Sequence, residues 1–293
     1  MKIIKPLLFF LSLITHALSF SQELPPIENF TPSDYHAENQ NWGIDQSDDK
    51  RIYIANNKGL LTYNGANWTL YPSPNQTIMR SVNVVGDKIY TGSYMEFGYW
   101  QTNEFGALIY TSLSDTLGLS LIEDEEFWKI IDIEQYLIFQ SLDRIYIYDS
   151  ERGTTRIIET KNSIIHSYKL DGSIYFQRIG EGIFKIENGQ DVLVSGAKIL
   201  QSQEVVAMFS NPKGVHLVTR DRGIFRMSSD DELLPWDGPL NDRLKSLSIY
   251  SAQQLKNKQL VFGSIANGLI LATAEGNKSV SYTHLTLPTT SRV

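Results

Sequence analysis

The stretch that decides the fold is residues 52–63, with the sequence IYIANNKGLLTY. Two apolar runs, Ile52-Tyr53-Ile54 and Leu60-Leu61-Thr62-Tyr63, flank a short polar segment that ends in Gly59. Short runs rich in β-branched and aromatic residues on either side of such a turn predict a β-hairpin. Both strands are apolar on both faces, so we expect other sheets to cover the hairpin on its two sides.

The same hairpin pattern recurs along the chain. Its later copies are residues 89–90 with 97–100, 137–139 with 145–148, 174–176 with 183–184, 215–217 with 224–225, and 260–262 with 269–271. In four of the six copies a glycine precedes the second strand, where a turn favours a residue that accepts positive φ at no steric cost (Gly59, Gly182, Gly223 and Gly268). The hairpins therefore belong to an internal repeat.

Upstream of the hairpin, each unit also begins with a recurring group of three residues, which we call the upstream column. Its members are Trp42-Gly43-Ile44, Arg80-Ser81-Val82, Trp128-Lys129-Ile130, His166-Ser167-Tyr168, Val206-Ala207-Met208 and Lys245-Ser246-Leu247. The unit repeats about every forty residues, a period that is typical of β-propellers when each unit holds several short strands. We predict an all-β propeller with six four-stranded blades in this chain, seven blades in the intact protein, and an incomplete C-terminal end.

The central residues of this column are mostly small, which suits innermost strands that converge on an axis. Lys129 is the exception. Its charge either points into the central channel or lies solvated at the channel mouth.

The two ends of the chain predict the domain boundaries. Residues 1–21 resemble a cleaved signal peptide, with Lys2 and Lys5 before an apolar run at 7–14 and small residues at Ser19 and Ser21. A membrane anchor is the alternative, but the apolar run is short and His16 interrupts it. We expect the propeller at 22–278. We interpret residues 279–293 as the translation of a sequencing adapter, so that the natural protein continues beyond Lys278.

Composition narrows the function. The formal net charge is -7 and no block of Lys or Arg occurs, which argues against a nucleic-acid surface. The chain has no cysteine, no Gly-x-Ser-x-Gly motif, no phosphate-binding glycine loop and no pair of histidines at metal-ligand spacing. We therefore predict no metal, no cofactor and no catalytic residue, and we interpret His216 as a satisfied, partly buried residue. The acidic run at 123–126 is interpreted as a solvated loop between blades two and three, although two of its carboxylates would suffice for a glycosidase.

Ligand binding in propellers concentrates on the face that carries the turns inside the hairpins and the connections between blades. Polar residues near those turns are our candidates for ligand contacts: Tyr94, Glu96, Lys129, Arg178, Arg220 and Arg222. An aromatic ring beside a carboxylate, as in Tyr94 and Glu96, suits a sugar or a peptide. The alternative is that these side chains are the polar residues that any hairpin turn carries.

The start of the propeller resembles a known family. The matching motifs are Asn29-Phe30-Thr31, Asp34-Tyr35, Glu38-Asn39-Gln40-Asn41-Trp42, Ile54-Ala55-Asn56-Asn57-Lys58-Gly59-Leu60-Leu61, Asn64-Gly65, Trp68, Met79-Arg80-Ser81-Val82 and Tyr94-Met95-Glu96-Phe97-Gly98-Tyr99-Trp100. They resemble the "two-component regulator propeller" of Bacteroidetes membrane-spanning regulators that carry a triple-tyrosine domain. The last two motifs favour the branch that ends in a LuxR-type helix-turn-helix over the hybrid histidine kinases.

This resemblance implies the N-terminal fragment of a seven-bladed periplasmic sensor. In the family the propeller is followed by the triple-tyrosine domain, one membrane span and a cytoplasmic output domain. DNA binding or kinase activity would belong to those missing parts, and membrane attachment to the missing span. The expected partner of this fragment is an extracytoplasmic ligand such as an oligosaccharide or a peptide, and a second copy, as a homodimer, is a further candidate. The alternative function is that of a secreted propeller enzyme, a polysaccharide lyase or a glycosidase.

Overall fold

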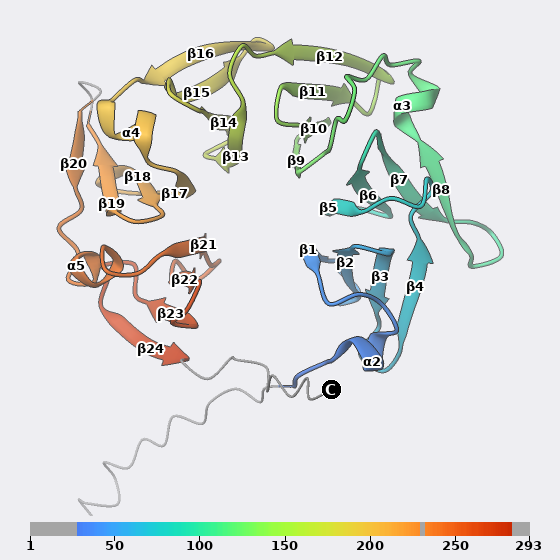
Figure 1. Cartoon of the computed structure of the whole chain (residues 1–293), viewed down its shortest axis with the longest axis horizontal. Helices are drawn as coiled ribbons and strands as arrows, with labels where there is room; N and C mark the ends of the chain where they lie inside the picture. The colour runs from blue at the N-terminus through green and yellow to red at the C-terminus, as the bar shows by residue number, and fades with distance from the viewer. Residues whose placement is uncertain (1–27, 229–231, 283–293) are drawn as a thin grey trace, which may run out of the picture. The chain divides into compact units, whose positions relative to one another are not determined.

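Residues 28–228 and 232–282, which the computed structural model describes, fold into six four-stranded sheets (Figure 1). The first three sheets contain β1 (Asn41–Gln46), β2 (Ile52–Asn56), β3 (Gly59–Tyr63) and β4 (Trp68–Pro72); β5 (Met79–Val85), β6 (Lys88–Ser93), β7 (Glu96–Thr102) and β8 (Leu108–Ser112); and β9 (Lys129–Ile133), β10 (Tyr136–Gln140), β11 (Arg144–Asp149) and β12 (Thr154–Glu159). The other three contain β13 (Ile164–Leu170), β14 (Ser173–Arg178), β15 (Gly182–Glu187) and β16 (Gln190–Ser195); β17 (Val205–Asn211), β18 (Gly214–Thr219), β19 (Gly223–Met227) and β20 (Leu233–Pro235); and β21 (Ile249–Gln254), β22 (Leu260–Ser264), β23 (Leu269–Ala272) and β24 (Lys278–Tyr282). Four one-turn helices connect or flank them: α2 (Pro32–Tyr35), α3 (Leu113–Thr116), α4 (Lys198–Ser202) and α5 (Asn241–Leu244).

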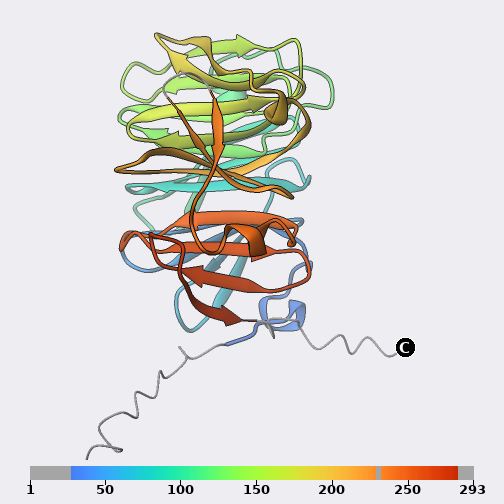
Figure 2. The same ribbon diagram turned by 90° about the vertical axis from the view of Figure 1, so that its left-hand side faces the viewer.

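Each sheet is an antiparallel meander whose strands are neighbours in chain order. The first strand of each sheet is innermost, and the innermost strands contact one another in the order β1, β5, β9, β13, β17, β21 (Figure 1). Figure 2 shows the strands running across the view, so that the loops gather on two opposite sides. The predicted β-propeller with six four-stranded blades is thereby confirmed, and each predicted hairpin is the second and third strand of a blade.

The innermost strands carry a recurrent irregularity. In five of the six blades the register between the first and second strands shifts by one residue, at Asn41/Gly43, Met79/Ser81, Ile164/Ser167, Val205/Ala207 and Ile249/Ser251. A bulge bends its strand and increases the local twist. The small residues of the upstream column come directly after this bend.

The prediction is wrong for the last member of that column, Ser246. The inner strand of the sixth blade begins at Ile249, and Ser251, opposite Gly263, stands where Ser246 was predicted. Ser246 lies in the turn after α5, where its backbone N–H donates to the carbonyl of Arg243. Leu244 in this helix is fully buried, and Leu247 after it packs against the same cluster. In the sequence, these closely spaced apolar residues resemble the start of a strand.

The core of the molecule is divided among the interfaces between successive blades. Five clusters of buried apolar side chains lie there, one for each adjacent pair. Between blades two and three, for example, Phe97 contacts Phe127 and Phe139 with ring centroids 4.6 and 4.4 Å apart. Burial of each such ring stabilises the fold by roughly 1.5–3 kcal/mol, so the blades hold together without disulfides.

The first blade has one face that no earlier blade covers. Ile44 on this face is 70% exposed, whereas Val82 in the second blade, one residue after the small position like Ile44, is 9% exposed. Helix α2 contacts β4 of this blade, and the ring centroids of its buried Tyr35 and of Trp68 are 5.6 Å apart. The helix thus shields the outer part of the blade.

The predicted domain boundaries remain predictions. Strand β24 pairs with β23, with Val280 opposite Leu271 and Ser281 opposite Ile270, so the sixth blade extends across the predicted boundary at residue 278. The predicted signal peptide at 1–21 and the part of the predicted adapter segment after residue 282 lie outside the described residues. Within residues 28–228 and 232–282, no helix has the length and apolar character that a membrane span requires.

Candidate functional site

Tyr94 lies in the loop between β6 and β7, on the side of the blade where β6 ends. Its hydroxyl donates to Asp124 Oδ1 at 2.5 Å, and its backbone forms an isolated bridge with Glu126. The hydrogen bond to Asp124 raises the pKa of the Tyr94 phenol. The acidic segment thus folds back onto the loop that carries Tyr94.

The interpretation of residues 123–126 as a solvated acidic loop is wrong for half of it. Glu123 and Asp124 are exposed, but Glu125 is buried and accepts hydrogen bonds from Ser141 Oγ at 2.7 Å and Tyr146 Oη at 2.8 Å. A buried carboxylate needs such donors because burial without them is costly. Glu125 therefore ties the acidic segment to blade three.

Glu96 does not join Tyr94. Its buried carboxylate points toward the outer strand β8 and accepts hydrogen bonds from Tyr110 Oη at 2.9 Å, Ser112 Oγ at 3.0 Å and Ser114 Oγ at 2.9 Å. Burial, followed by the charge of Glu96, raises the pKa of Tyr110 far above its usual range. The pair that the sequence suggested as a ligand platform is separated, because Met95 between them adopts positive φ and neighbouring side chains diverge.

Arg178 is also held inside the protein. Its guanidinium lies over the Phe184 ring, with Cζ 3.8 Å from the centroid, and it forms ion pairs with Asp191 and, at 3.4 Å, with Glu181. The side chain is only 9% exposed, and burial lowers its pKa despite the charge of Glu181. Arg178 therefore packs against the blade three–four interface.

Arg220 and Arg222 do not contribute to a common site either. Arg222 is exposed, while Arg220 forms ion pairs with both oxygens of Glu204 at 2.8 and 2.9 Å. His166 Nε2 lies 2.8 Å from the same carboxylate. Burial alone would raise the pKa of Glu204, but the hydrogen bond and charge of His166 together with the charge of Arg220 outweigh it and hold that pKa below its ordinary value.

Lys129 lines a pocket of about 410 Å³ among the innermost strands, together with His166, Lys169 and Gln253, and we call it the axial pocket. Its side chain is reached by solvent, yet the surrounding strands crowd it closely enough that desolvation lowers its pKa, opposed by the charge of Asp45. A ligand in this pocket can therefore contact the Lys129 side chain. Nearby, Lys169 Nζ pairs with Asp132 at 3.0 Å.

A cluster that the sequence did not single out lies at the start of the first three inner strands. We call Trp42, Arg80, Glu126 and Trp128 the axial cluster. The Arg80 Cζ atom lies 4.1 Å from the Trp42 centroid and 4.5 Å from the Trp128 centroid, and Arg80 Nη2 pairs with Glu126 Oε1 at 2.9 Å. Trp42 and Trp128 belong to blades one and three and are 5.8 Å apart, a contact that non-neighbouring blades can make only near the axis.

The signal for this cluster was present in the sequence. Trp42, Arg80 and Trp128 are each the residue before the small position of the upstream column, so they occupy equivalent places in adjacent blades. Only the central residues of those triplets entered the prediction. Residues at equivalent places in neighbouring blades converge because their strands converge on one axis.

A pocket of about 430 Å³ lies beside the axial cluster, and we call it the rim pocket. It is lined by loops from three blades, through Glu38, Asn57, Gln76, Thr77, Ile78, Tyr94 and Glu126. Asn57 in this lining is held from two sides, because its Oδ1 accepts from Trp42 Nε1 at 2.8 Å and its Nδ2 donates to Glu38 at 2.8 Å. Its lining therefore offers carboxylate, amide and hydroxyl groups next to an exposed indole.

The described residues show no arrangement that would hold a metal ion: nowhere within 28–228 and 232–282 do three His, Asp or Glu side chains come together. Of the six predicted ligand-binding residues, Tyr94 alone lines the rim pocket, and Lys129 lines the axial pocket. Glu96 and Arg178 lie in internal networks, Arg220 is paired with Glu204, and Arg222 stands apart on the surface.

Comparison with solved structures agrees with this architecture. The chain is similar to the extracellular domain of a proposed one-component system from B. thetaiotaomicron, with 17% identity and a TM-score of 0.57 over 82% of this chain and 33% of that one. It is similar to the extracellular domain of a proposed hybrid two-component system from the same organism, with 14% identity and a TM-score of 0.64 over 87% of this chain and 36% of that one. It is likewise similar to virginiamycin B lyase from Staphylococcus aureus, with 15% identity and a TM-score of 0.65 over 85% of this chain and 87% of that one.

At these identities the likeness establishes the fold. The chain is a β-propeller. It spans about a third of the length of the two extracellular domains. No protein-family model matches the sequence, and no curated protein does.

Proposed function

We propose that the chain is the ligand-sensing propeller of a periplasmic receptor and that it binds a neutral oligosaccharide at the rim pocket. The observation that carries the proposal is the exposed Trp42 indole, held by Asn57 next to a pocket lined by carboxylates, amides and hydroxyls. Sugars are bound by such combinations because their C–H faces pack on aromatic rings while their hydroxyls bond to polar side chains. Tyr94 is the predicted site residue that takes part.

The charge of the rim pocket favours a neutral ligand over an anionic one. Glu38 and Glu126 both line it, its lining among the described residues contains no Lys or Arg, and Arg80 of the axial cluster is already paired with Glu126. An anion would have to be placed beside the carboxylate of Glu38, where like charges repel. A neutral sugar avoids this cost and can donate hydroxyl hydrogens to both carboxylates.

The sensing role is supported by the similarity to the two extracellular domains of signalling systems and by the motifs at the start of the propeller. In this proposal the chain is extracytoplasmic, itself non-catalytic, and the input part of a transmembrane regulator. Ligand binding would change how the propeller packs on the domain that follows it, which shifts an equilibrium between two signalling states. DNA binding or kinase activity would belong to the output part of the parent protein.

The test is calorimetric titration of the chain with neutral pentasaccharides of the cello, xylo, manno and malto series. We expect one of them to bind with a Kd below about 1 mM. Glu38→Ala should weaken that binding at least tenfold, while Glu104→Ala, in an exposed loop of blade two, should leave it unchanged. The proposal fails if none of the sugars binds, if only peptides bind, or if the two variants behave alike.

One observation favours an enzyme as the second candidate function. His166, Glu204 and Arg220 form a connected group at the start of the inner strands, and His166 also lines the axial pocket. A carboxylate that stays ionised can orient an imidazole for general acid–base chemistry. A polysaccharide lyase or glycosidase would then lose its cleavage of polysaccharide in His166→Ala, whereas the sensor would bind its sugar without cleaving it.

A further inference from the structure

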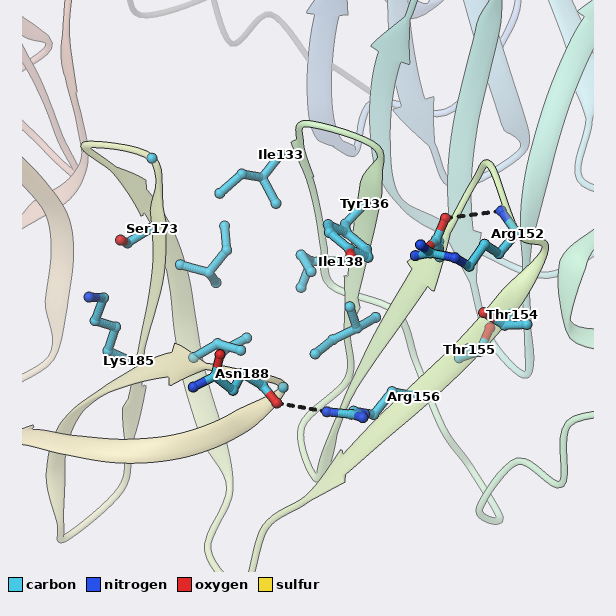
Figure 3. A pocket seen from close by; sticks show the side chains of 16 residues that line it. Ile133, Tyr136, Ile138, Arg152, Thr154, Thr155, Arg156, Ser173, Lys185 and Asn188 are labelled. Atoms are coloured by element: carbon cyan, nitrogen blue, oxygen red, sulfur yellow. Dashed lines mark hydrogen bonds and ion pairs between the residues drawn. The ribbon is translucent and has the colours of Figure 1, made fainter.

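We propose that the cleft between blades three and four is a second binding site, for a small amphipathic anion: an acidic group on an apolar body. The cleft holds about 730 Å³ and is lined by strands β9 to β12 on one side and, on the other, by β14, β15 and the turns that precede β14 and follow β15 (Figure 3). That volume is within the range of small-molecule sites in proteins, roughly 300–1,000 Å³. It lies at a different blade interface from the rim pocket and does not depend on the proposed sugar-binding role.

One row of residues across blade three forms the wall of the cleft. Ile138, Ile147 and Arg156 are register partners on β10, β11 and β12, so their side chains project from the same face of the sheet. The row runs from an apolar position near the core to a cation at the outer strand. This gradient is what an amphipathic ligand needs.

The equivalent row in blade two is filled by its own side chains. Its residues are Tyr90, Tyr99 and Thr111, again register partners on successive strands. The Tyr90 and Tyr99 rings lie 5.7 Å apart, and both pack against the cluster between blades two and three. The cleft between blades three and four is therefore open because isoleucines replace two tyrosines, and its rim carries a cation because arginine replaces threonine.

The cation at the rim is held in place by the opposite blade. Arg156 Nη1 donates to the carbonyl of Asn188 at 2.7 Å, across the cleft from blade three to blade four (Figure 3). The guanidinium lies against Gly189, where an added Cβ would stand 2.2 Å from Arg156 Nη1. Gly189 also has φ of +74°, so this turn both requires glycine and leaves room for the arginine. A guanidinium has five N–H donors, and the contact with Asn188 uses one of them.

The remaining charges favour an anion. Arg152 and Lys185 join Arg156 in the lining, but Arg152 is paired with Asp149 at 2.8 Å and Lys185 with Glu187 at 2.9 Å. Arg156 is thus the lining cation that has no carboxylate partner among the described residues, in a chain whose net charge is -7.

The probe for this site is 8-anilinonaphthalene-1-sulfonate, an apolar ring system with one sulfonate, followed by its fluorescence. The neutral comparison is N-phenyl-1-naphthylamine, which has the same rings without the acid. We expect saturable binding of both, tighter for the sulfonate. Arg156→Gln should weaken sulfonate binding at least fivefold and the neutral compound less than twofold. Lys88→Gln, which removes a cation stacked on Tyr99 at the filled interface, should change neither.

Ile147→Tyr tests the cavity itself, because it copies the residue that fills the same place in blade two. Binding of both compounds should be lost while the thermal unfolding transition followed by circular dichroism is kept. If that variant does not fold, Gly189→Ala gives the answer, because displacing Arg156 should weaken sulfonate binding as Arg156→Gln does. Unchanged sulfonate binding in Arg156→Gln, or in a folded Ile147→Tyr, would overturn the proposal.

Discussion

The Arg80 guanidinium stacks on the Trp42 indole across the interface of the first two blades, with Cζ 4.1 Å from the ring centroid. Arg80 also contacts Trp128 and Glu126, so that one side chain links three blades near the axis. It is 12% exposed and its partner Glu126 is 22% exposed. Such a contact holds the loops around the rim pocket in one arrangement, which a binding site needs before its ligand arrives.

Arg80→Leu should lower the free energy of unfolding by about 2 kcal/mol, because it removes two cation–π contacts and leaves Glu126 without its partner. Arg80→Lys keeps the charge but not the planar fork, so it should recover less than half of the loss. Lys213→Leu breaks an exposed ion pair with Asp237 and should cost less than about 0.5 kcal/mol. Urea unfolding of the three variants checks the order; equal stability of Arg80→Leu and wild type would refute it.

Glu96→Ala should destabilise the chain by about 3 kcal/mol, since the hydroxyls of Tyr110, Ser112 and Ser114 lose a common acceptor in a buried place. A residue that binds ligand at the surface would not cost this much. Glu123→Ala, in the exposed part of the acidic segment, is the matched control and should stay within about 0.5 kcal/mol of wild type. Thermal melting of the two variants distinguishes a buried structural Glu96 from a ligand-binding surface residue. Equal melting temperatures for Glu96→Ala and Glu123→Ala would contradict the structural role.

Gly92→Ala should be much more damaging than Gly43→Ala. A Cβ at Gly92 would stand 2.6 Å from both Phe127 Cβ and Ser81 Oγ, so blades two and three would have to separate. At Gly43 the nearest atom would be 3.5 Å away, an ordinary contact. We expect a loss of about 2 kcal/mol or more for the first and less than about 1 kcal/mol for the second, measured by chemical unfolding. If Gly43→Ala lost more stability than Gly92→Ala, the tighter packing would lie at the innermost strand, against this prediction.

His216 should make the chain less stable in acid. Its ring is buried and stacks on Phe209, its Nδ1 lies 3.0 Å from the Gly214 carbonyl, and burial lowers its pKa below 6.5 in spite of that contact. The prediction of a satisfied, partly buried residue is correct for burial and wrong for satisfaction, because the ring is fully buried and Nε2 has no partner among the described residues. As pH falls below 6.5, His216 is protonated in the unfolded chain before it is protonated in the folded one. The stability that the neutral, buried ring contributes is therefore complete above pH 6.5 and is lost as pH falls toward the folded-state pKa.

Replacing the ring tests this dependence. His216→Phe should flatten the slope of unfolding free energy against pH between about pH 7 and pH 5. His36→Asn, at an exposed position with positive φ, should keep the wild-type slope. A full wild-type slope in His216→Phe would show that other groups cause the acid sensitivity.

The hairpins could be predicted because their information is local. Apolar runs such as Leu137–Phe139 and Ile145–Tyr148 flank a turn within about a dozen residues, and the two strands pair with each other in the structure. The upstream column was correct in five units, and it failed at Ser246 because a buried helical turn has a similar apolar spacing. The predicted ligand residues depended on loop position alone, and loop position does not say which way a side chain turns.

The amino-acid sequence by itself determined the repeat, the all-β class and the four-stranded blade, because short apolar runs and turn glycines act between neighbours in the chain. Only the tertiary structure decided which charges meet. Arg80 and Glu126 are 46 residues apart, and Glu96, Glu125 and Arg178 turn inward toward partners supplied by other strands. The physical reason is that a charge is buried only where donors or a counter-charge converge on it, and that convergence exists once the blades have packed around their axis.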